Sequence, residues 1–332
     1  MPPVLAFMTM SPGTHHYQYL FGPVPSRRLG WSLGVDLTPP KTCSLDCVFC
    51  QLGRTTVKTT ARREYVPVAG VVAEIADWLQ GGGTADYITL AGSGEPTLHS
   101  RFGEIIEQTR RLTTIPVALL TNGTLLHLPE VRQAACMAAV VKVTLAAADE
   151  TLFARIHRPC EGVTLAQVLE GQRQLRAEFT GGLWLEVFLL WGVNSTPADV
   201  RRLAALAREI RPDRVHLNTC VRPPAEASAE AVPLERLAEL AALFEPRAEV
   251  VAEFSAALSA HTQVTEDAVL ALLRRRPCTA HQVAQAFGLH ANEVSKYLGK
   301  LVRTHRASVE RRHGEAYYVG AGPQAAEGDP HA

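Results

Sequence analysis

Three cysteines stand within eight residues of one another, close behind Lys41. Cys43, Cys47 and Cys50 have the spacing CxxxCxxC. Thiolates this close lie on one loop, and they can hold three irons of a [4Fe-4S] cluster. Since no fourth cysteine is nearby, the fourth iron would keep an open position, and an open metal position is a reactive one. The trio therefore predicts a reactive iron–sulfur site.

A structural zinc site is the alternative for the same cysteines. Such a site needs four closed ligands, commonly in two CxxC-like pairs. The sequence has no second pair, so His99 or Cys160 would have to complete it. The cysteines outside the trio are scattered singly, unlike a secreted disulfide framework, and we interpret them as buried apolar thiols: Cys136, Cys160, Cys220 and Cys278.

Composition and length fit a soluble globular protein with one large and one small domain. The chain has 332 residues, of which 47% are hydrophobic and 20% charged. Its longest apolar run, residues 183–193, is too short to span a bilayer and contains Glu186. Residues 1–13 lack a basic region and a cleavage site typical of a signal peptide. We therefore expect a cytoplasmic protein with no membrane association.

Short β-rich runs alternate with amphipathic stretches between residues 32 and 253, as in βα units around a parallel sheet. The predicted strands are residues 32–37, 87–91, 117–121, 140–145, 183–190 and 215–218, with a weaker one at 249–252. The predicted helices include residues 71–79, 101–111, 129–135, 165–178, 197–210 and 233–244. This order predicts an α/β fold in which the polar motifs follow strands, where βα barrels place their sites.

Two polar motifs follow neighbouring predicted strands. Gly92-Ser93-Gly94-Glu95 comes after the second strand, where the glycines let backbone groups approach a ligand and the acid could bind a cation such as an ammonium group. Asn122 follows the third strand; the alternative is that it only caps the next helix. An ordinary strand-to-helix loop is likewise the alternative for Gly92–Glu95.

The cysteine motif, with Phe49 directly before Cys50, resembles the cluster motif of the radical S-adenosylmethionine (radical SAM) enzymes. Residues 22–54 further resemble a branch of poorly characterised iron–sulfur oxidoreductases, remotely similar to the enzymes that build wyosine in tRNA. The resemblance extends over about residues 20–255 and its motifs are specific.

The resemblance implies a partial (β/α)6 TIM-like barrel with one cluster whose open iron is chelated by S-adenosylmethionine. An electron from a donor such as ferredoxin or flavodoxin would cleave this cofactor to a 5'-deoxyadenosyl radical. The radical would abstract hydrogen from an unidentified substrate, which could be RNA, a peptide or protein, or a small molecule. The cofactor carries the hard chemistry, and the protein positions it.

The resemblance also assigns residues to the cofactor. In the family a Gly-Gly-Glu run holds the methionine amino group, and here Ser93 replaces its middle glycine. Relatives often have Ser-Leu-Asp-Ala on the fourth strand; Thr144 keeps the hydroxyl, whereas Ala146 lacks the acid. The residues expected to bind S-adenosylmethionine are Phe49, Gly92, Ser93, Gly94, Glu95, Asn122 and Thr144.

Charged residues also fall on predicted strands and their ends. Glu186 and Arg222 would face the barrel interior or mouth, where an unpaired charge is costly. We expect each to pair either with the other or with a ligand. Arg27 and Arg28, before the first predicted strand, could bind a phosphate or carboxylate, or form a solvated turn. His157 and His216 are more typical of core or surface histidines than of ligands.

The pattern changes after residue 255. Helices at residues 266–275, 279–287 and 291–305, then a β-rich end at 307–319, predict a winged helix-turn-helix. The expected domains are an N-terminal extension (1–20), the catalytic domain (21–255), a linker (256–262), the winged helix (263–320) and a disordered tail (321–332).

The predicted winged helix is basic. Residues 263–319 hold nine Lys and Arg against five acids, a net charge of +4, in a chain of zero net charge. Such a unit could bind nucleic acid or a peptide, or dock on its own catalytic domain. The residues expected to contact a nucleic acid are Tyr297, Arg303, Arg311 and Arg312. An iron–sulfur redox-sensing transcription regulator is the alternative function.

Overall fold

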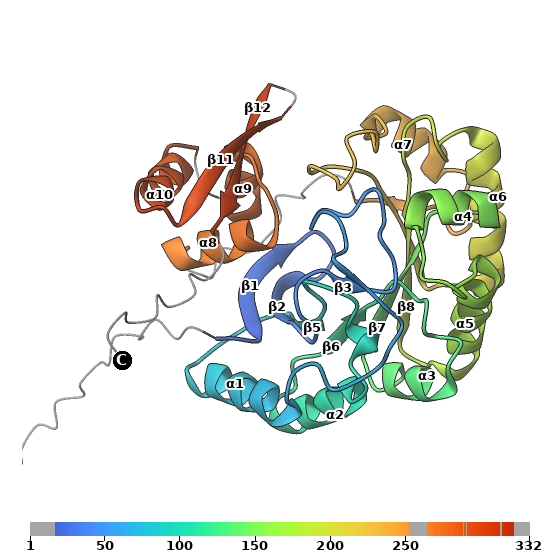
Figure 1. Ribbon diagram of the computed structural model, residues 1–332, viewed down its shortest axis with the longest axis horizontal. Coiled ribbons are helices and arrows are strands. Elements are labelled where there is room, and N and C mark those ends of the chain that lie inside the picture. The colour runs from blue at the N-terminus through green and yellow to red at the C-terminus, as the bar shows by residue number, and fades with distance from the viewer. Residues whose placement is uncertain (1–16, 252–263, 288, 290, 313, 322–332) are drawn as a thin grey trace, which may run out of the picture.

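The computed structural model describes residues 17–251 and 264–321, apart from 288, 290 and 313 (Figure 1). Most of the predicted N-terminal extension, the predicted linker and nearly all of the predicted tail lie outside these residues. Among the described helices, none is both long and apolar enough to cross a membrane.

One eight-stranded sheet forms the centre of the molecule, with the strand order β1-β2-β5-β6-β7-β8-β9-β10. All neighbours from β2 onwards are parallel, and β1 pairs with β2 in the antiparallel direction. The strands are β1 (Leu20–Ser26), β2 (Gly30–Val35), β5 (Tyr87–Leu90), β6 (Val117–Leu120), β7 (Val140–Leu145), β8 (Gly182–Phe188), β9 (Arg214–Asn218) and β10 (Glu249–Val250).

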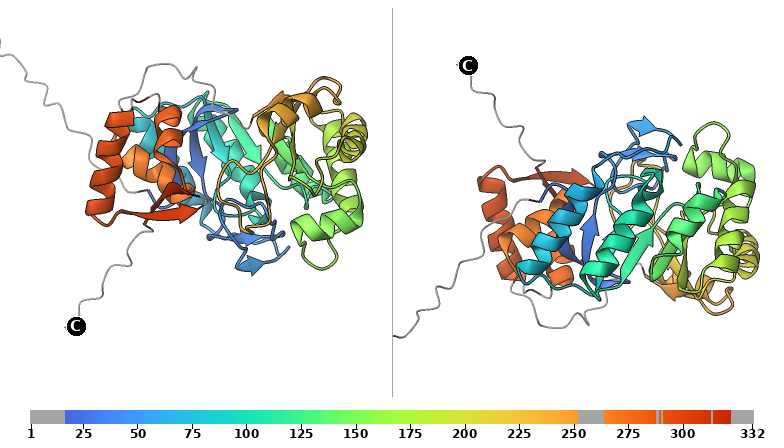
Figure 2. Two further views of the ribbon diagram at one scale, coloured as in Figure 1. Left: turned by 90° about the horizontal axis from the view of Figure 1, so that it is seen from above. Right: turned by 90° about the horizontal axis from the view of Figure 1, so that it is seen from below.

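Helices cover the outer face of the curved sheet (Figures 1 and 2). They are α1 (Val68–Gln80), α2 (Phe102–Leu112), α3 (Pro129–Ala135), α4 (Glu150–His157), α5 (Leu165–Glu178), α6 (Pro197–Ile210) and α7 (Leu234–Ala241). Local sequence sets several of their ends. Thr164 forms a capping box with Gln167 at α5, and Thr196 caps α6, whose first residue is Pro197.

The predicted α/β class and partial barrel are confirmed, since the six predicted parallel strands all lie in this sheet. Strand β1, helix α4 and three short elements were not predicted; the short ones are β3 (Thr42–Cys43), β4 (Val57–Lys58) and the 3-10 helix Pro96–Leu98. Strand β1 contains Pro23 and Pro25, which argue against a strand, but it lies at the sheet edge, where proline is tolerated. Helix α4 has only eight residues and begins with Asp149 as its N-cap.

The C-terminal residues form a separate unit with its own apolar core. It contains α8 (Glu266–Arg275), α9 (Ala280–Phe287), α10 (Ala291–Arg303) and the antiparallel hairpin β11 (Ala307–Arg312) and β12 (Glu315–Gly320). Its core packs against Val24 of β1 and Trp31 of β2, and Trp31 lies 6.1 Å from the ring of Phe287. Figures 1 and 2 show the unit beside β1, on the opposite side of the barrel from α5 and α6. Three helices followed by a hairpin are compatible with a winged helix, which stays a prediction.

Much of the basic charge of this C-terminal unit is used in internal contacts. Arg275 contacts Asp36 of the barrel, and Lys300 and Arg306 both pair with Glu266. The hydroxyl of Tyr297, a predicted nucleic-acid contact, donates to the carbonyl of Val264. Because Asp36 belongs to the barrel, its contact with Arg275 lowers the charge that the unit offers to a nucleic acid, whereas Glu266 is already counted in the net charge of +4.

Candidate active site

The cysteine loop follows β2 and is fixed by backbone hydrogen bonds to the end of α4. Asp46 N donates to the carbonyl of His157, and Val48 N donates to the carbonyl of Ile156, both over 2.9 Å. Cys43 closes a short strand, β3 (Thr42–Cys43), which pairs with β4 (Val57–Lys58). All three cysteines therefore lie on a loop that is held at both of its ends.

The loop that contains Gly92–Glu95 lies directly against the cysteine loop. Lys41 N donates to Ser93 O over 2.5 Å, and Glu95 N donates to Thr42 O over 3.0 Å. A Cβ atom at Gly94 would collide with the carbonyl of Thr42, so glycine is required for this close approach. The two motifs, which are about fifty residues apart in the sequence, thus form one surface.

Glu95 is 3% exposed, and its carboxylate accepts four hydrogen bonds from the protein itself. The donors are the amide and hydroxyl of Thr97, the hydroxyl of Thr121 and the amide of Asn122, at 2.6–3.1 Å. Burial raises the pKa of this carboxyl group, whereas these four bonds lower it. Glu95 therefore ties the loop after β5 to the loop after β6.

Asn122 reaches the cysteine loop from the end of β6. Its Nδ2 donates to the Ser44 hydroxyl over 3.0 Å and lies 3.5 Å from the sulfur of Cys43. Its Oδ1 accepts from the amide of Thr124 over 2.9 Å. Asn122 thus accepts a bond within its own turn, as expected if it only capped the next helix, and it contacts the cysteine loop as well.

His157 lies against the cysteine trio, a position that the sequence did not reveal. Its Nδ1 is 3.1 Å from Sγ of Cys47, and burial lowers the pKa of the imidazole to about 4. Phe49 packs edge-on against His157 and stacks on Phe188 with ring centroids 4.0 Å apart. These rings form an apolar wall beside the cysteines.

Thr144 lies on β7. It lines one small cavity together with Asn122 and His157. Ala146, where relatives have an acid, is 1% exposed and packs in an apolar cluster with Phe188. The structure thus brings Thr144 to the same side of the barrel as the other predicted cofactor residues.

The thiol environment fits an iron–sulfur cluster. Burial raises the pKa of Cys43 to about 12 and also raises that of Cys47 and Cys50, so the thiolates need a bound cation to stabilise their charge. Hydrogen-bond donors close to the sulfurs, such as the amide of Asn122, are typical of cluster sites.

The zinc alternative gains no support. In the part of the chain that the structure describes, no three His, Cys, Asp or Glu side chains gather around a single metal-ion position. Both ring nitrogens of His99 are engaged, Nε2 with the carbonyl of Val66 and Nδ1 with the amide of Arg101. His99 is therefore already used as a structural residue.

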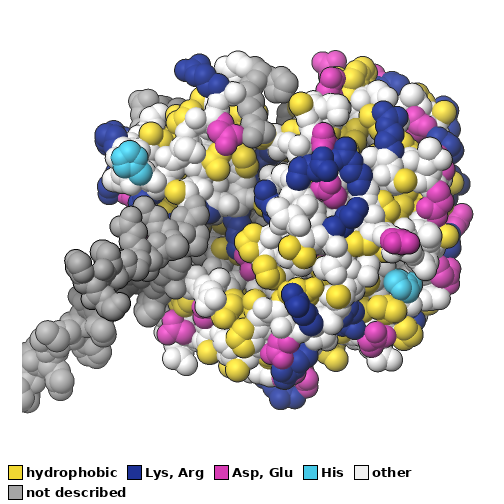
Figure 3. Space-filling model, viewed as in Figure 1, with side chains coloured by type: hydrophobic (Ala, Val, Ile, Leu, Met, Phe, Trp, Pro, Cys, Tyr) yellow, Lys and Arg dark blue, Asp and Glu magenta, His cyan; other side chains and the backbone are white. Residues whose placement is uncertain are grey.

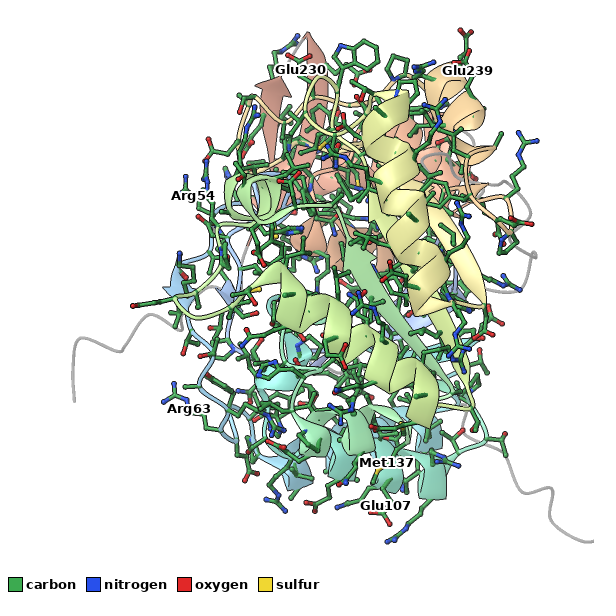
Figure 4. The ribbon with its side chains drawn as sticks, turned by 90° about the vertical axis from the view of Figure 1, so that its right-hand side faces the viewer. Arg54, Arg63, Glu107, Met137, Glu230 and Glu239 are labelled. Atoms are coloured by element: carbon green, nitrogen blue, oxygen red, sulfur yellow. The ribbon has the colours of Figure 1, made fainter. Side chains whose placement is uncertain are left out.

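Two acids outside the predicted site hold it in place. Asp36, just after β2, accepts a 2.7 Å hydrogen bond from the amide of Ser93. Asp46 pairs with Arg54, which lies at the outer edge of the molecule in Figure 4 and also pairs with Glu226. Figure 3 shows basic and acidic side chains next to one another over the barrel. A carboxylate at the carboxyl end of a strand, as in Asp36, is the signal that sequence analysis could have used.

Glu186 and Arg222 do not pair with each other, which was one of the two expectations from the sequence. Glu186 contacts Arg28, and it accepts from Lys142 Nζ over 2.6 Å. Arg222 instead donates to the side chain of Gln51, the residue after Cys50, over 3.1 Å. Glu186 is therefore a structural ion partner, and Arg222 belongs to the rim near the cysteines.

A barrel with a cysteine loop of this kind defines a class of protein, and the comparison with known families agrees. A family model described as the radical SAM superfamily matches residues 37–207. The chain belongs to the radical SAM superfamily, whose members are enzymes that bind a [4Fe-4S] cluster and S-adenosylmethionine. The resemblance read from the cysteine motif is therefore confirmed.

Two relatives are similar over most of this chain. A UPF0026 protein of Methanocaldococcus jannaschii is 34% identical over 226 residues, covering 68% of this chain and 70% of that protein. A protein named GTPase Obg from Brachyspira hyodysenteriae is 34% identical over 304 residues, 90% of this chain but only 45% of that protein. This chain thus spans less than half of the second relative, and it lacks the GxxxxGK[ST] motif of P-loop GTPases.

Among solved structures, a radical SAM methyltransferase from Sphaerobacter thermophilus is similar, with a TM-score of 0.50 and 21% identity. The match covers 68% of this chain and 66% of that chain. At this identity the likeness concerns the fold, which agrees with the partial barrel.

Proposed function

We propose that this protein reductively cleaves S-adenosylmethionine at a single [4Fe-4S] cluster to a 5'-deoxyadenosyl radical that abstracts hydrogen from a substrate. The observation that carries the proposal is the contact between two motif loops. The cysteine loop and the Gly92–Glu95 loop are joined by two backbone hydrogen bonds, at 2.5 and 3.0 Å. A ligand bound to an iron at the first loop would thereby meet the backbone of the second.

In this proposal Cys43, Cys47 and Cys50 hold the cluster. Buried sulfurs with raised pKa values gain most from a bound cation, because a metal removes their protons and compensates their charge. Asn122 orients the sulfur of Cys43, and His157 orients that of Cys47.

The remaining predicted residues would bind S-adenosylmethionine. Backbone groups of Gly92, Ser93 and Gly94 would receive its methionine part. Three of the four protein donors to the Glu95 carboxylate bind Oε1, so Oε2, which accepts from the amide of Asn122, would also accept from the methionine ammonium group. Phe49 and Thr144 would contact the rest of the cofactor from the apolar wall and from β7.

The C-terminal unit (residues 264–321) is proposed to recruit the substrate or the reductant. Superfamily members need an electron donor such as ferredoxin or flavodoxin. The alternative of an iron–sulfur transcription regulator is supported neither by the family match nor by the fold comparison.

Electron paramagnetic resonance of the anaerobically reconstituted, dithionite-reduced protein tests this proposal. Addition of S-adenosylmethionine is expected to change the signal of the reduced cluster, because the cofactor would bind the open iron. An unchanged signal, or a reconstituted protein that holds zinc and no iron, would contradict the proposal.

A further inference from the structure

A large cavity lies between the barrel and the C-terminal unit. Its volume is about 1570 Å³, and both parts of the chain line it. The barrel contributes Gln51, directly after the cysteine trio, and Pro223, from the loop after β9; the C-terminal unit contributes Arg276. Gln282 of α9 donates to the carbonyl of Val221 over 2.9 Å and so holds the C-terminal unit against the loop after β9.

Five buried or half-buried basic side chains lie in the barrel interior and where it meets the C-terminal unit, and one of them, Arg276, lines the cavity. They are Arg27, Arg28, Lys142, Arg222 and Arg276. In the described contacts, Arg28 and Lys142 form ion pairs with the same acid, Glu186. Arg27 is held by neutral groups, with bonds of 3.2 Å to the side chain of Asn218 and 2.6 Å to the carbonyl of Val251.

Two of these guanidinium groups have donors without a partner among the residues that the structure describes. They are Nε of Arg222, a side chain that is 8% exposed, and Nε and NH2 of Arg276, which are buried atoms. Burial lowers the pKa of both groups, and each of them has a side-chain hydrogen bond with Cys278, so the two guanidinium groups lie around one thiol. Buried, unpaired cationic donors are costly unless a ligand of opposite charge satisfies them.

We propose that Arg222 and Arg276 bind an oxyanion group, a carboxylate or phosphate, of the substrate at the edge of this cavity, which Arg276 and Gln51, the partner of Arg222, line. Guanidinium donors match the planar or tetrahedral oxygens of such groups. Arg222 also bonds to Gln51, next to Cys50, so an anion held there is anchored near the proposed cluster. One arginine comes from each part of the chain, so the ligand would bridge the barrel and the C-terminal unit. The assignment of this anion to the substrate rests on the proposed function, whereas the anion site itself does not.

Titration of the full-length, reconstituted protein with inorganic phosphate and with acetate, against chloride at equal ionic strength, tests the site. Calorimetry is expected to detect saturable binding of phosphate, acetate or both, accompanied by a rise in Tm that chloride does not produce. The anion that binds distinguishes a phosphate from a carboxylate ligand. Equal effects of all three salts would overturn the proposal.

Variants locate the binding. Arg222→Gln and Arg276→Gln should each weaken anion binding about tenfold or more, because each removes a charge-assisted donor. Arg276→Gln should also raise the Tm of the anion-free protein, since it removes an unpaired buried cation. If Arg276→Gln folds poorly, Arg276→Lys replaces it in the binding measurement. The exposed Lys296, changed to Gln, is the control and should bind anions as the original does. Unchanged binding by both site variants would refute the assignment.

Two further comparisons separate this inference from the proposed function. Anion affinity should be the same with saturating S-adenosylmethionine; competition would mean that the arginines hold the carboxylate of that cofactor, which would overturn the substrate assignment. Anion binding by a protein that fails to cleave S-adenosylmethionine would refute the proposed function and keep the anion site. Cleavage without anion binding would refute the site alone.

Discussion

Arg275, the last residue of α8, donates a 2.8 Å hydrogen bond to the hydroxyl of Ser93. Its guanidinium group also contacts Asp36 and lies 3.3 Å from the centre of the Phe21 ring. Asp36 in turn accepts from the amide of Ser93. A cation of the C-terminal unit is thus directly linked to the loop proposed to receive the methionine part of the cofactor.

Changing Arg275 to Gln should weaken S-adenosylmethionine binding about fivefold, or ~1 kcal/mol, because the Ser93 loop loses a charge-assisted support while its backbone bonds remain. Equilibrium binding to the reconstituted protein measures the change, and Arg303→Gln is the control on the same unit. Unaltered affinity in Arg275→Gln would mean that the contact only joins the two parts of the chain.

The carboxylate of Glu95 gives a second prediction. Glu95→Gln replaces one accepting oxygen by an amide donor, which faces the buried donors of Thr97, Thr121 or Asn122. Each unsatisfied buried donor costs about 1–3 kcal/mol, so we expect a loss of ~2–4 kcal/mol in the free energy of unfolding. Urea denaturation measures it. The exposed Glu161, changed to Gln, should stay within about 0.5 kcal/mol of the original.

Removing the charge of Glu186 is expected to lower the free energy of unfolding more than removing the charge of a surface ion pair. Glu186→Gln leaves the cations of Arg28 and Lys142 buried without their counter-charge, at a cost of about 3–5 kcal/mol. Glu209→Gln, which breaks a pair with Arg173 at an acid side chain that is 53% exposed, should cost about 0–1 kcal/mol. Similar losses in the two variants would show that the barrel interior is hydrated enough to solvate these charges.

His216 predicts a pH dependence of stability. Burial, followed by the charge of Arg28, lowers the pKa of this imidazole from 6.5 to about 4. His216 in the unfolded chain therefore binds a proton below about pH 6.5, whereas His216 in the folded chain binds it only below about pH 4. The contribution of His216 to stability is complete above pH 6.5 and declines by up to about 3 kcal/mol as the pH falls to 4.

The difference between the original protein and His216→Asn isolates this contribution. Unfolding free energies measured from pH 7 to pH 4 should decline less steeply in the variant, because it lacks the titrating group. Parallel curves would mean that His216 titrates alike in the folded and unfolded chains.

Local sequence signals predicted much of the fold. The ends of α5 and α6 match their predicted ranges because Thr164 and Thr196 supply caps that depend only on neighbouring residues. The hydrophobic runs of the parallel strands were equally clear, because such strands are buried on both faces. Strand β1 was missed because Pro23 and Pro25 oppose a strand everywhere except at an edge, and edge position is set by tertiary structure.

The motifs of the site could be predicted from the sequence, but the residues that hold these motifs in place could not. The spacing of the cysteines identified the class, but His157 meets Cys47 across 110 positions of the chain, and no local pattern records that contact. The partners of Glu186 likewise depend on register, which places Lys142 and Arg28 next to it in place of Arg222. The contact of Arg275 with Ser93 depends on how the C-terminal unit packs on β1.

The most direct test of the central claim is the formation of 5'-deoxyadenosine by the anaerobically reconstituted protein given dithionite and S-adenosylmethionine. Chromatography with mass detection should find this product with the original chain and none with Cys47→Ala, while Cys136→Ala, which changes a cysteine outside the trio, should keep the activity. Equal product from the original chain and from Cys47→Ala, or none from a protein shown to carry its iron, would contradict the account.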